Sequence, residues 1–191
     1  MQTGKIVQII LGTEAENIKY SIEQIIKKGG MNPKKIIEYE RALKLINPME
    51  GEIVPLEDVP DEVFSERLLG DGFAVNPYKN KVYSPPIEGT IKFLFPSNNA
   101  LAIETKEGLE ILIHIGIDTV NLNGEGFKVY IKEKEKIKKG QLLVSYDKKI
   151  LDKHAKSLIS PIIITNLKGS SEIKIEYGYK KDKEIVAYIR N

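Results

Sequence analysis

The sequence contains no cysteine and no tryptophan, and histidine occurs only twice in its 191 residues. The absence of cysteine excludes disulfide bonds, thiolate nucleophiles, and zinc or iron–sulfur sites that use cysteine ligands. It also fits the reducing conditions of a cytoplasm. Because histidine is the side chain that most readily changes its protonation near neutral pH, His114 and His154 are the first candidates for chemistry.

A surplus of charge of one sign is also missing. The chain has 29 Lys and Arg residues against 27 Asp and Glu residues, a formal net charge of +2, and the two signs are mixed along the sequence. This balance offers no basic face that would attract nucleic acid or an anionic membrane. We therefore expect no nucleic-acid partner.

Long apolar runs are absent as well, and the longest are far too short to cross a bilayer. The apolar run that follows Lys5 leads into acidic residues and lacks the small-residue cleavage site of a signal peptide. Hydrophobic residues make up 41 % of the chain, which suffices for one sizeable core. We expect a soluble, cytoplasmic protein without membrane insertion.

Several catalytic motifs are missing too: there is no Gly-x-Ser-x-Gly, no phosphate-binding P-loop, no His-Glu-x-x-His, and no His–carboxylate spacing suited to a metal. The residues therefore indicate neither a cofactor nor a metal site.

The first part of the chain has a helical texture. Residues 5–11 form a β-type run, and residues 12–30 predict a helix that begins with a capping box from Thr13 to Glu16 and ends at two glycines. A second predicted helix, "PKKIIEYERALKLI", ends at Ile46, before Asn47 and Pro48.

From about residue 45 onward, short β-branched runs alternate with turn signals, commonly about 8–12 residues apart. This pattern predicts an all-β domain, an antiparallel sandwich or barrel. The stretches "PMEGEI" (residues 48–53) and "PIEGTI" (residues 86–91) share Pro, Glu, Gly and Ile at the same offsets. They indicate either a repeated β-element or a turn that recurs by chance.

His114 lies in the stretch "LEILIHIGI". Alternation along a strand places Leu109, Ile111 and the following isoleucines on a core face, and His114 on the opposite face beside Leu112. A partly apolar wall would favour the neutral imidazole, which can act as a nucleophile or base. The alternative is a surface histidine without a task. His154 lies in a polar, lysine-rich helical segment, where we expect it to be solvated.

The motifs "VPDEVF", "GDG", "LIHIGIDTVNLNGEGF" and "KKGQLLVSYD", in this order, carry a resemblance to a known family. The chain from Asn47 to its C-terminus, about 145 residues, resembles the glucose-type enzyme IIA of the bacterial sugar phosphotransferase system. The resemblance implies an antiparallel β-sandwich with a histidine in a shallow apolar depression.

By this resemblance, His114 accepts a phosphoryl group from the phosphocarrier HPr and passes it to a cysteine of enzyme IIB. Ser97 stands where the family usually has threonine and keeps the hydroxyl. The implied docking rim around the histidine consists of Asp61, Phe64, Phe95, Leu112 and Asp118.

One position departs from the family pattern. The family has a second histidine where this chain has Asn99, in "NNA". An asparagine can donate a hydrogen bond to a phosphoryl oxygen, but it cannot become charged or shuttle a proton. We therefore expect His114 to accept phosphate, onward transfer to be weaker, and the two-histidine zinc site that family members form with a partner to be absent.

The N-terminal residues resemble the last strand and helix of an enzyme IIB domain, without the part that bears its cysteine. We therefore divide the chain into a IIB-like remnant (residues 1–29), a helical linker (residues 30–46) and an enzyme IIA domain (residues 47–191). Two functions remain open: a phosphocarrier between HPr and a separate IIB domain, and a regulatory module whose phosphorylation at His114 changes which target proteins it binds.

Overall fold

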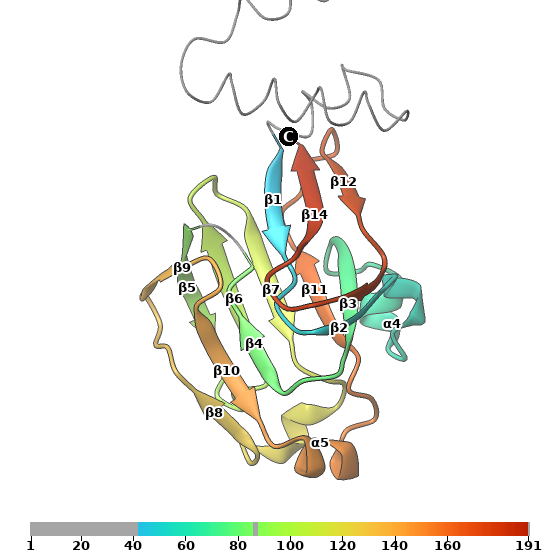
Figure 1. Ribbon diagram of the computed structural model, residues 1–191, viewed down its shortest axis with the longest axis vertical. Helices are drawn as coiled ribbons and strands as arrows, with labels where there is room; N and C mark the ends of the chain where they lie inside the picture. The colour runs from blue at the N-terminus through green and yellow to red at the C-terminus, as the bar shows by residue number, and fades with distance from the viewer. Residues whose placement is uncertain (1–41, 86–87, 191) are drawn as a thin grey trace, which may run out of the picture. The chain divides into compact units, whose positions relative to one another are not determined.

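The computed structural model describes residues 42–85 and 88–190 (Figure 1). The compact unit that contains almost all of them begins at Leu43. The strand and helix expected in the IIB-like remnant, and most of the predicted linker, lie outside the described residues.

A sheet of eight strands forms the largest layer, and every neighbouring pair in it is antiparallel. Its spatial order is β13 (Gly178–Lys180), β2 (Gly51–Val54), β3 (Asp71–Pro77), β11 (Ser160–Ile164), β7 (Glu110–His114), β6 (Ala100–Thr105), β5 (Glu88–Leu94) and β9 (Lys136–Lys138).

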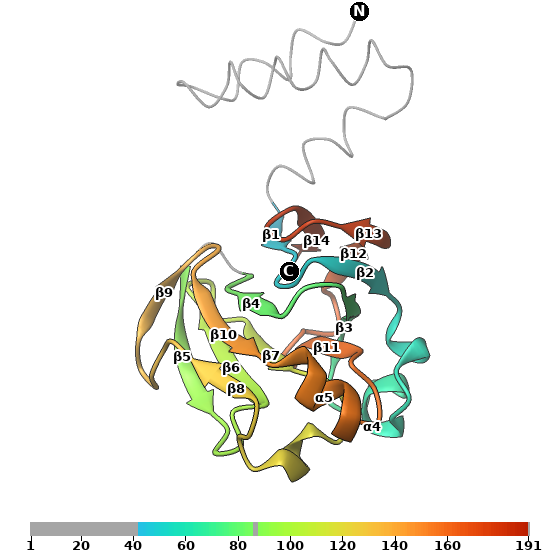
Figure 2. The ribbon, with the colours of Figure 1, turned by 60° about the horizontal axis from the view of Figure 1, so that its bottom comes forward.

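Two antiparallel sheets of three strands complete the described β-structure. One contains β4 (Lys81–Tyr83), β10 (Leu142–Tyr146) and β8 (Phe127–Val129), and the other contains β1 (Leu43–Ile46), β14 (Ile185–Arg190) and β12 (Glu172–Ile175). Figures 1 and 2 show β4 and β10 lying across the β5–β6–β7 part of the large sheet. The prediction of an all-β antiparallel sandwich is confirmed.

The main core lies between the layers, because alternate residues of each strand point inward. Ile113 is paired with Ile162, which is paired with Phe73, and all three side chains are fully buried. Val82 and Val144 belong to the same cluster and come from the β4–β10–β8 sheet. The isoleucine face predicted for β7 is therefore its core face.

A second apolar cluster covers part of the opposite, outer face of the large sheet. Leu56 and Phe64 come from η1 (Leu56–Asp58) and α4 (Glu62–Ser65), and they pack with Ala74, Ile117 and Ile163. Figure 1 shows α4 beside β2 and β3. Two further short elements, η2 (Thr119–Leu122) and α5 (Lys148–His154), contact each other.

The helix expected to run to Ile46 is wrong over its last four residues, which form β1. These residues pair with β14, and Leu45 and Ile46 become buried there. Burial against a distant strand has overridden the local helical pattern, because propensity is the weaker influence. No helix in the described part of the chain is long and apolar enough to cross a membrane.

Candidate functional site

His114 is the last residue of β7, and its side chain lies on the outer face of the large sheet. It is paired with Ala100 on β6. After β7 the chain turns at Gly116, which has a φ of +67° in the left-handed region that favours glycine. This turn brings the Gly116 carbonyl back toward the His114 ring.

The Nδ1 atom of His114 lies 2.7 Å from the carbonyl oxygen of Gly116. A carbonyl oxygen can only accept, so Nδ1 carries the hydrogen. In the neutral ring Nε2 therefore keeps its lone pair, and the amide Nδ2 of Asn99 donates toward it over 3.3 Å. The nitrogen that is free to react is Nε2.

The orientation of the Asn99 amide follows from its other partners. The Oδ1 atom accepts a hydrogen bond from the hydroxyl of Ser97. The Nδ2 atom also donates to Thr119 Oγ1 over 3.3 Å. The amide nitrogen, rather than the oxygen, thus faces the histidine, and the structure brings the predicted residues Ser97, Asn99 and His114 together.

Burial controls the protonation of the ring. The Phe64 ring contacts His114 with 5.3 Å between the ring centroids. Burial lowers the pKa of His114 below its ordinary value, and the Gly116 carbonyl and the carboxylates of Asp61 and Asp118 offset this only in part. The ring is held neutral, as expected from its partly apolar surroundings.

Asp61 and Asp118 occupy the turns beside the histidine. Asp61 caps α4, and its carboxylate accepts from the Val63 amide over 2.9 Å. Asp118 precedes η2 with a left-handed φ of 62°. Within the described part of the chain, neither carboxylate forms an ion pair.

Phe95 and Leu112 lie on the same outer face as His114. Leu112 packs on the second apolar cluster, and Phe95, which is 38 % exposed, donates its backbone N–H to the Ala100 carbonyl. All predicted site residues therefore gather around one face of the sheet.

Sequence reasoning missed Phe93. Simple alternation would place it with the buried Ile91 on the core face, but the register of β5 against β6 shifts between these two residues. After this bulge Phe93 is paired with Ala102 on the outer face, is 45 % exposed, and contacts Phe95 edge-on with 4.9 Å between the ring centroids. The two phenylalanines in "KFLF" were the only feature of the sequence that pointed to Phe93 as a neighbour of Phe95.

Sequence reasoning also missed two buried hydroxyls, those of Thr119 and Ser160. Both side chains are fully buried, and both bond to the backbone beside Gly116. Thr119 lies inside the motif "GIDTV", but nothing in the residues around Ser160 indicates that its hydroxyl reaches Gly116. His154, at the end of α5, is exposed as expected.

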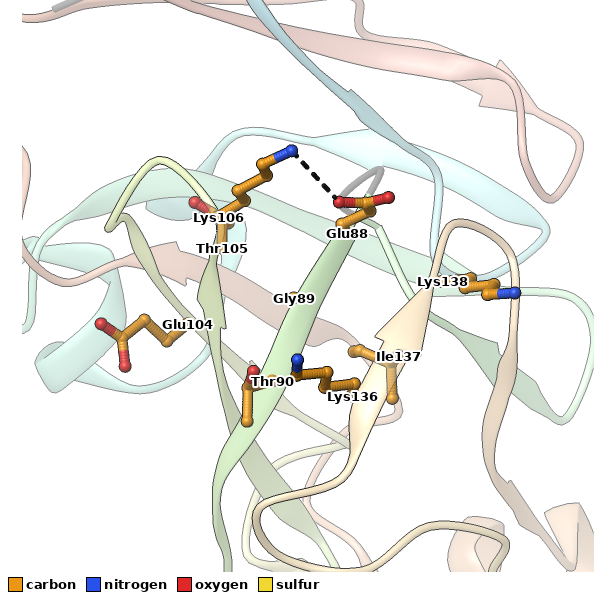
Figure 3. A pocket seen from close by; sticks show the side chains of 9 residues that line it. All are labelled: Glu88, Gly89, Thr90, Glu104, Thr105, Lys106, Lys136, Ile137 and Lys138. Atoms are coloured by element: carbon orange, nitrogen blue, oxygen red, sulfur yellow. Dashed lines mark ion pairs between the residues drawn. The ribbon is translucent and has the colours of Figure 1, made fainter.

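Among the hollows of the described residues, one lies beside α4 and another lies away from the predicted site residues. One, of about 600 Å³, is lined by Asp61, Val63 and Lys156 with their neighbours on α4. The other, of about 610 Å³, lies among β5, β6 and β9 and contains none of the predicted site residues (Figure 3). In the second hollow, Lys106 and Glu88 point toward each other as an ion pair of 3.6 Å.

The arrangement suits nucleophilic attack by a neutral imidazole. Nε2 has its lone pair, Nδ1–H is anchored, and a neutral N–H donor stands beside the reacting nitrogen. Among the described residues, no cluster of three or more His, Asp or Glu side chains is suited to hold a metal ion.

Comparison with known proteins finds the same family. The model of "phosphoenolpyruvate-dependent sugar phosphotransferase system, EIIA 1" matches residues 43–169. Among solved structures, glucose permease IIA from Mycoplasma capricolum has a TM-score of 0.74 and 42 % identity, covering 78 % of this chain and 96 % of that chain.

Two curated relatives are named glucose-specific EIICBA components. The one from Staphylococcus carnosus is 34 % identical and covers 100 % of this chain, and the one from Staphylococcus saprophyticus is 37 % identical and covers 87 %. This chain spans only 30 % and 26 % of their respective lengths. The family match, the relatives and the shared fold agree with one another, and the chain belongs to the EIIA type 1 family of the phosphoenolpyruvate-dependent sugar phosphotransferase system.

Proposed function

We propose that this chain is a phosphocarrier of sugar uptake. His114 accepts a phosphoryl group from phospho-HPr in the cytoplasm and passes it to a cysteine of a IIB domain on another chain. The observation that carries this proposal is the hydrogen bond from His114 Nδ1 to the Gly116 carbonyl, because it leaves Nε2 with its lone pair as a neutral nucleophile.

The bonds formed and broken in the transfer account for all atoms and electrons without a cofactor. Nε2 attacks the phosphorus atom, the bond from phosphorus to the donor breaks, and its electron pair stays on the donor. The Asn99 N–H that points at Nε2 then lies beside the new phosphoryl group and can donate to one of its oxygens. Phosphoryl transfer requires mainly this kind of positioning and charge stabilisation.

The surroundings of His114 favour a protein as the donor over a small phosphate ester. Asp61 and Asp118 would repel a free anion, whereas a protein that brings positive charge beside its phosphoryl group would be attracted. The exposed rings of Phe93 and Phe95 and the side chain of Leu112 supply apolar area that a docked partner would cover. HPr and a IIB domain are the partners that membership of this family suggests.

The test is transfer of label from phosphoenolpyruvate through the system's first enzyme and HPr. We expect the wild-type chain to become labelled and His114→Ala to remain unlabelled, and label to move on when a glucose-type IIB domain is added. His154→Ala is the matched control and should behave as wild type, because His154 is exposed on α5. The proposal would be contradicted if His114→Ala became labelled or if the wild-type chain did not.

A regulatory module is the second candidate, and Asn99 is the observation that favours it. Asn99 is buried beside Nε2 and contributes only a neutral donor. Without a second imidazole, no proton can move at this position as the phosphoryl group leaves. A phosphoryl group that stays on His114 would mark a protein whose binding to target proteins depends on phosphorylation.

Substitution of Asn99 by histidine separates the two functions. We expect Asn99→His to speed transfer from phospho-His114 to the IIB domain by about tenfold, because a positioned acid–base group typically contributes at least this much. The loss of label from the chain after addition of IIB measures this rate. Asn99→Ala is the control, and an unchanged rate in Asn99→His would contradict our account of this position.

A further inference from the structure

The peptide unit between Ile115 and Gly116 is held at both ends by buried hydroxyls. Its N–H, from Gly116, donates to Ser160 Oγ over 3.0 Å. Its carbonyl, from Ile115, accepts from Thr119 Oγ1 over 2.6 Å. Thr119 and Ser160 are both 0 % exposed, so water cannot replace either partner.

Both hydroxyls are themselves fixed. Ser160 Oγ donates to the Leu158 carbonyl over 2.9 Å, so its lone pair is turned toward the Gly116 N–H. Thr119 Oγ1 uses its hydrogen on Ile115 and accepts from Asn99 Nδ2. Neither hydroxyl has freedom to reorient without the loss of a buried hydrogen bond.

The next peptide unit decides which His114 nitrogen carries the proton. Its carbonyl, from Gly116, accepts from His114 Nδ1, and its N–H, from Ile117, donates to the Ser157 carbonyl over 2.7 Å. Because the two peptide units share the α-carbon of Gly116, a rotation of the first would turn this carbonyl away from Nδ1. Glycine lacks the side chain that would otherwise restrict such a rotation.

Thr119 also reaches the other side of the ring. Through Asn99 Nδ2, its oxygen helps to aim the amide that faces Nε2. The Thr119 hydroxyl therefore bonds both to the Ile115–Gly116 peptide unit, next to the one that accepts from Nδ1, and to the Asn99 amide that donates toward Nε2.

We propose that Thr119 and Ser160 are positioning residues that hold His114 in the tautomer with Nδ1 protonated and Nε2 free to accept a phosphoryl group. Neither touches the reacting atoms. The effect on the tautomer stands on the hydrogen bonds alone, whereas the effect on phosphoryl transfer rests on the proposed phosphocarrier function.

The experiment compares variants that remove a hydroxyl with matched variants that keep it or remove an unrelated one. Thr119→Val removes the hydroxyl at nearly constant volume, and Thr119→Ser keeps it. Ser160→Ala removes the second hydroxyl. Ser157→Ala is its control, because Ser157 Oγ accepts from Ile159 N–H and makes no bond to Gly116.

Two readouts are needed: the tautomer of His114 from the 15N shifts of its ring nitrogens, assigned by their absence in His114→Ala, and the rate of labelling by phospho-HPr. We expect Thr119→Val and Ser160→Ala to raise the share of rings protonated on Nε2. Both should lower kcat for labelling about tenfold with little change in KM for HPr, while Thr119→Ser and Ser157→Ala resemble wild type.

The proposal is overturned if Thr119→Val and Ser160→Ala keep the wild-type 15N shifts, whether or not labelling slows, since slower transfer with an unchanged tautomer means a merely structural role. If Thr119→Val does not fold, Ser160→Ala against Ser157→Ala decides alone. If the wild-type chain takes no label but the tautomer still shifts as expected, the phosphocarrier function fails and the positioning role stands.

Discussion

At the scale of single residues, the two nitrogens of His114 have different tasks. Nδ1 is committed to the Gly116 carbonyl, and Nε2 faces a neutral amide donor from Asn99. Burial beside Phe64 keeps the ring neutral, although two carboxylates stand near it. Desolvation thus outweighs the attraction that Asp61 and Asp118 would exert on an imidazolium.

This balance predicts the titration of His114. Its lowered pKa means that the NMR midpoint should fall below about 6.5, the value of an unperturbed histidine. Protonation of His114 is harder in the folded than in the unfolded state. The contribution of the neutral ring to the free energy of unfolding is therefore fully present above about pH 6.5, the pKa of a histidine in the unfolded chain. It is lost as the pH falls through the lower, folded-state pKa.

The stability consequence is checked with His114→Gln, which cannot titrate. Urea unfolding of both proteins between about pH 7.5 and pH 5 should show wild type losing free energy of unfolding relative to the variant as the pH falls. A midpoint above that of an unperturbed histidine, or a relative gain by wild type at low pH, would refute the assignment.

At the scale of elements, the turn after β7 leaves little space around Gly116. Gly116 has a φ of +67°, and an added Cβ would lie 2.9 Å from Thr119 Cγ2 and 3.0 Å from the Ser157 carbonyl oxygen. Both neighbours are held by hydrogen bonds, so they have little room to move. The turn therefore needs glycine for its conformation and for its space.

Gly116→Ala should lower the free energy of unfolding by about 2–4 kcal/mol, the range of left-handed strain plus crowding in a packed site. Gly108→Ala is the matched control, because Gly108 has a φ of +83° but nothing within 4 Å of an added Cβ. Gly108→Ala should lower the free energy of unfolding by only about 1–2 kcal/mol, because the left-handed conformation alone is strained there. Urea unfolding measures both, and equal losses would show that crowding at Gly116 contributes nothing.

At the scale of the whole described unit, the two faces of the large sheet have different tasks. The inner face builds the main core with the β4–β10–β8 sheet, and the outer face carries His114 beside the second cluster. The bulge in β5 extends the apolar part of the outer face from Leu112 across Ala102 to Phe93. The ion pair between Lys92 and Glu110 follows one step further along the strands.

Phe93 should therefore contribute to docking and not to chemistry. We expect Phe93→Ala to raise KM for phospho-HPr about tenfold with kcat nearly unchanged, since burying a half-exposed aromatic ring is worth about 1–2 kcal/mol. Tyr78→Ala is the control, because Tyr78 is 54 % exposed but stacks on Tyr179 after β3, away from β7. A similar KM change in both variants would contradict a specific docking role for Phe93.

Local patterns were sufficient for much of the fold. Short β-branched runs between turn signals predicted the antiparallel sandwich, and alternation in "LEILIHIGI" predicted which side of β7 carries His114. They failed where contacts between distant residues decide the outcome. Leu43–Ile46 became a strand by pairing with β14 near the other end of the chain, and a register shift against β6 turned Phe93 outward.

The sequence by itself determined the family, the sandwich fold and the histidine on its outer face, because motif order and strand periodicity are properties of neighbouring residues. Only the tertiary structure decided which ring nitrogen is free, which end of the Asn99 amide faces it, and which buried hydroxyls hold the Gly116 turn. These depend on side chains from the β5–β6 turn, β7, η2 and β11 meeting at hydrogen-bond distance, and spacing along the chain does not encode such meetings.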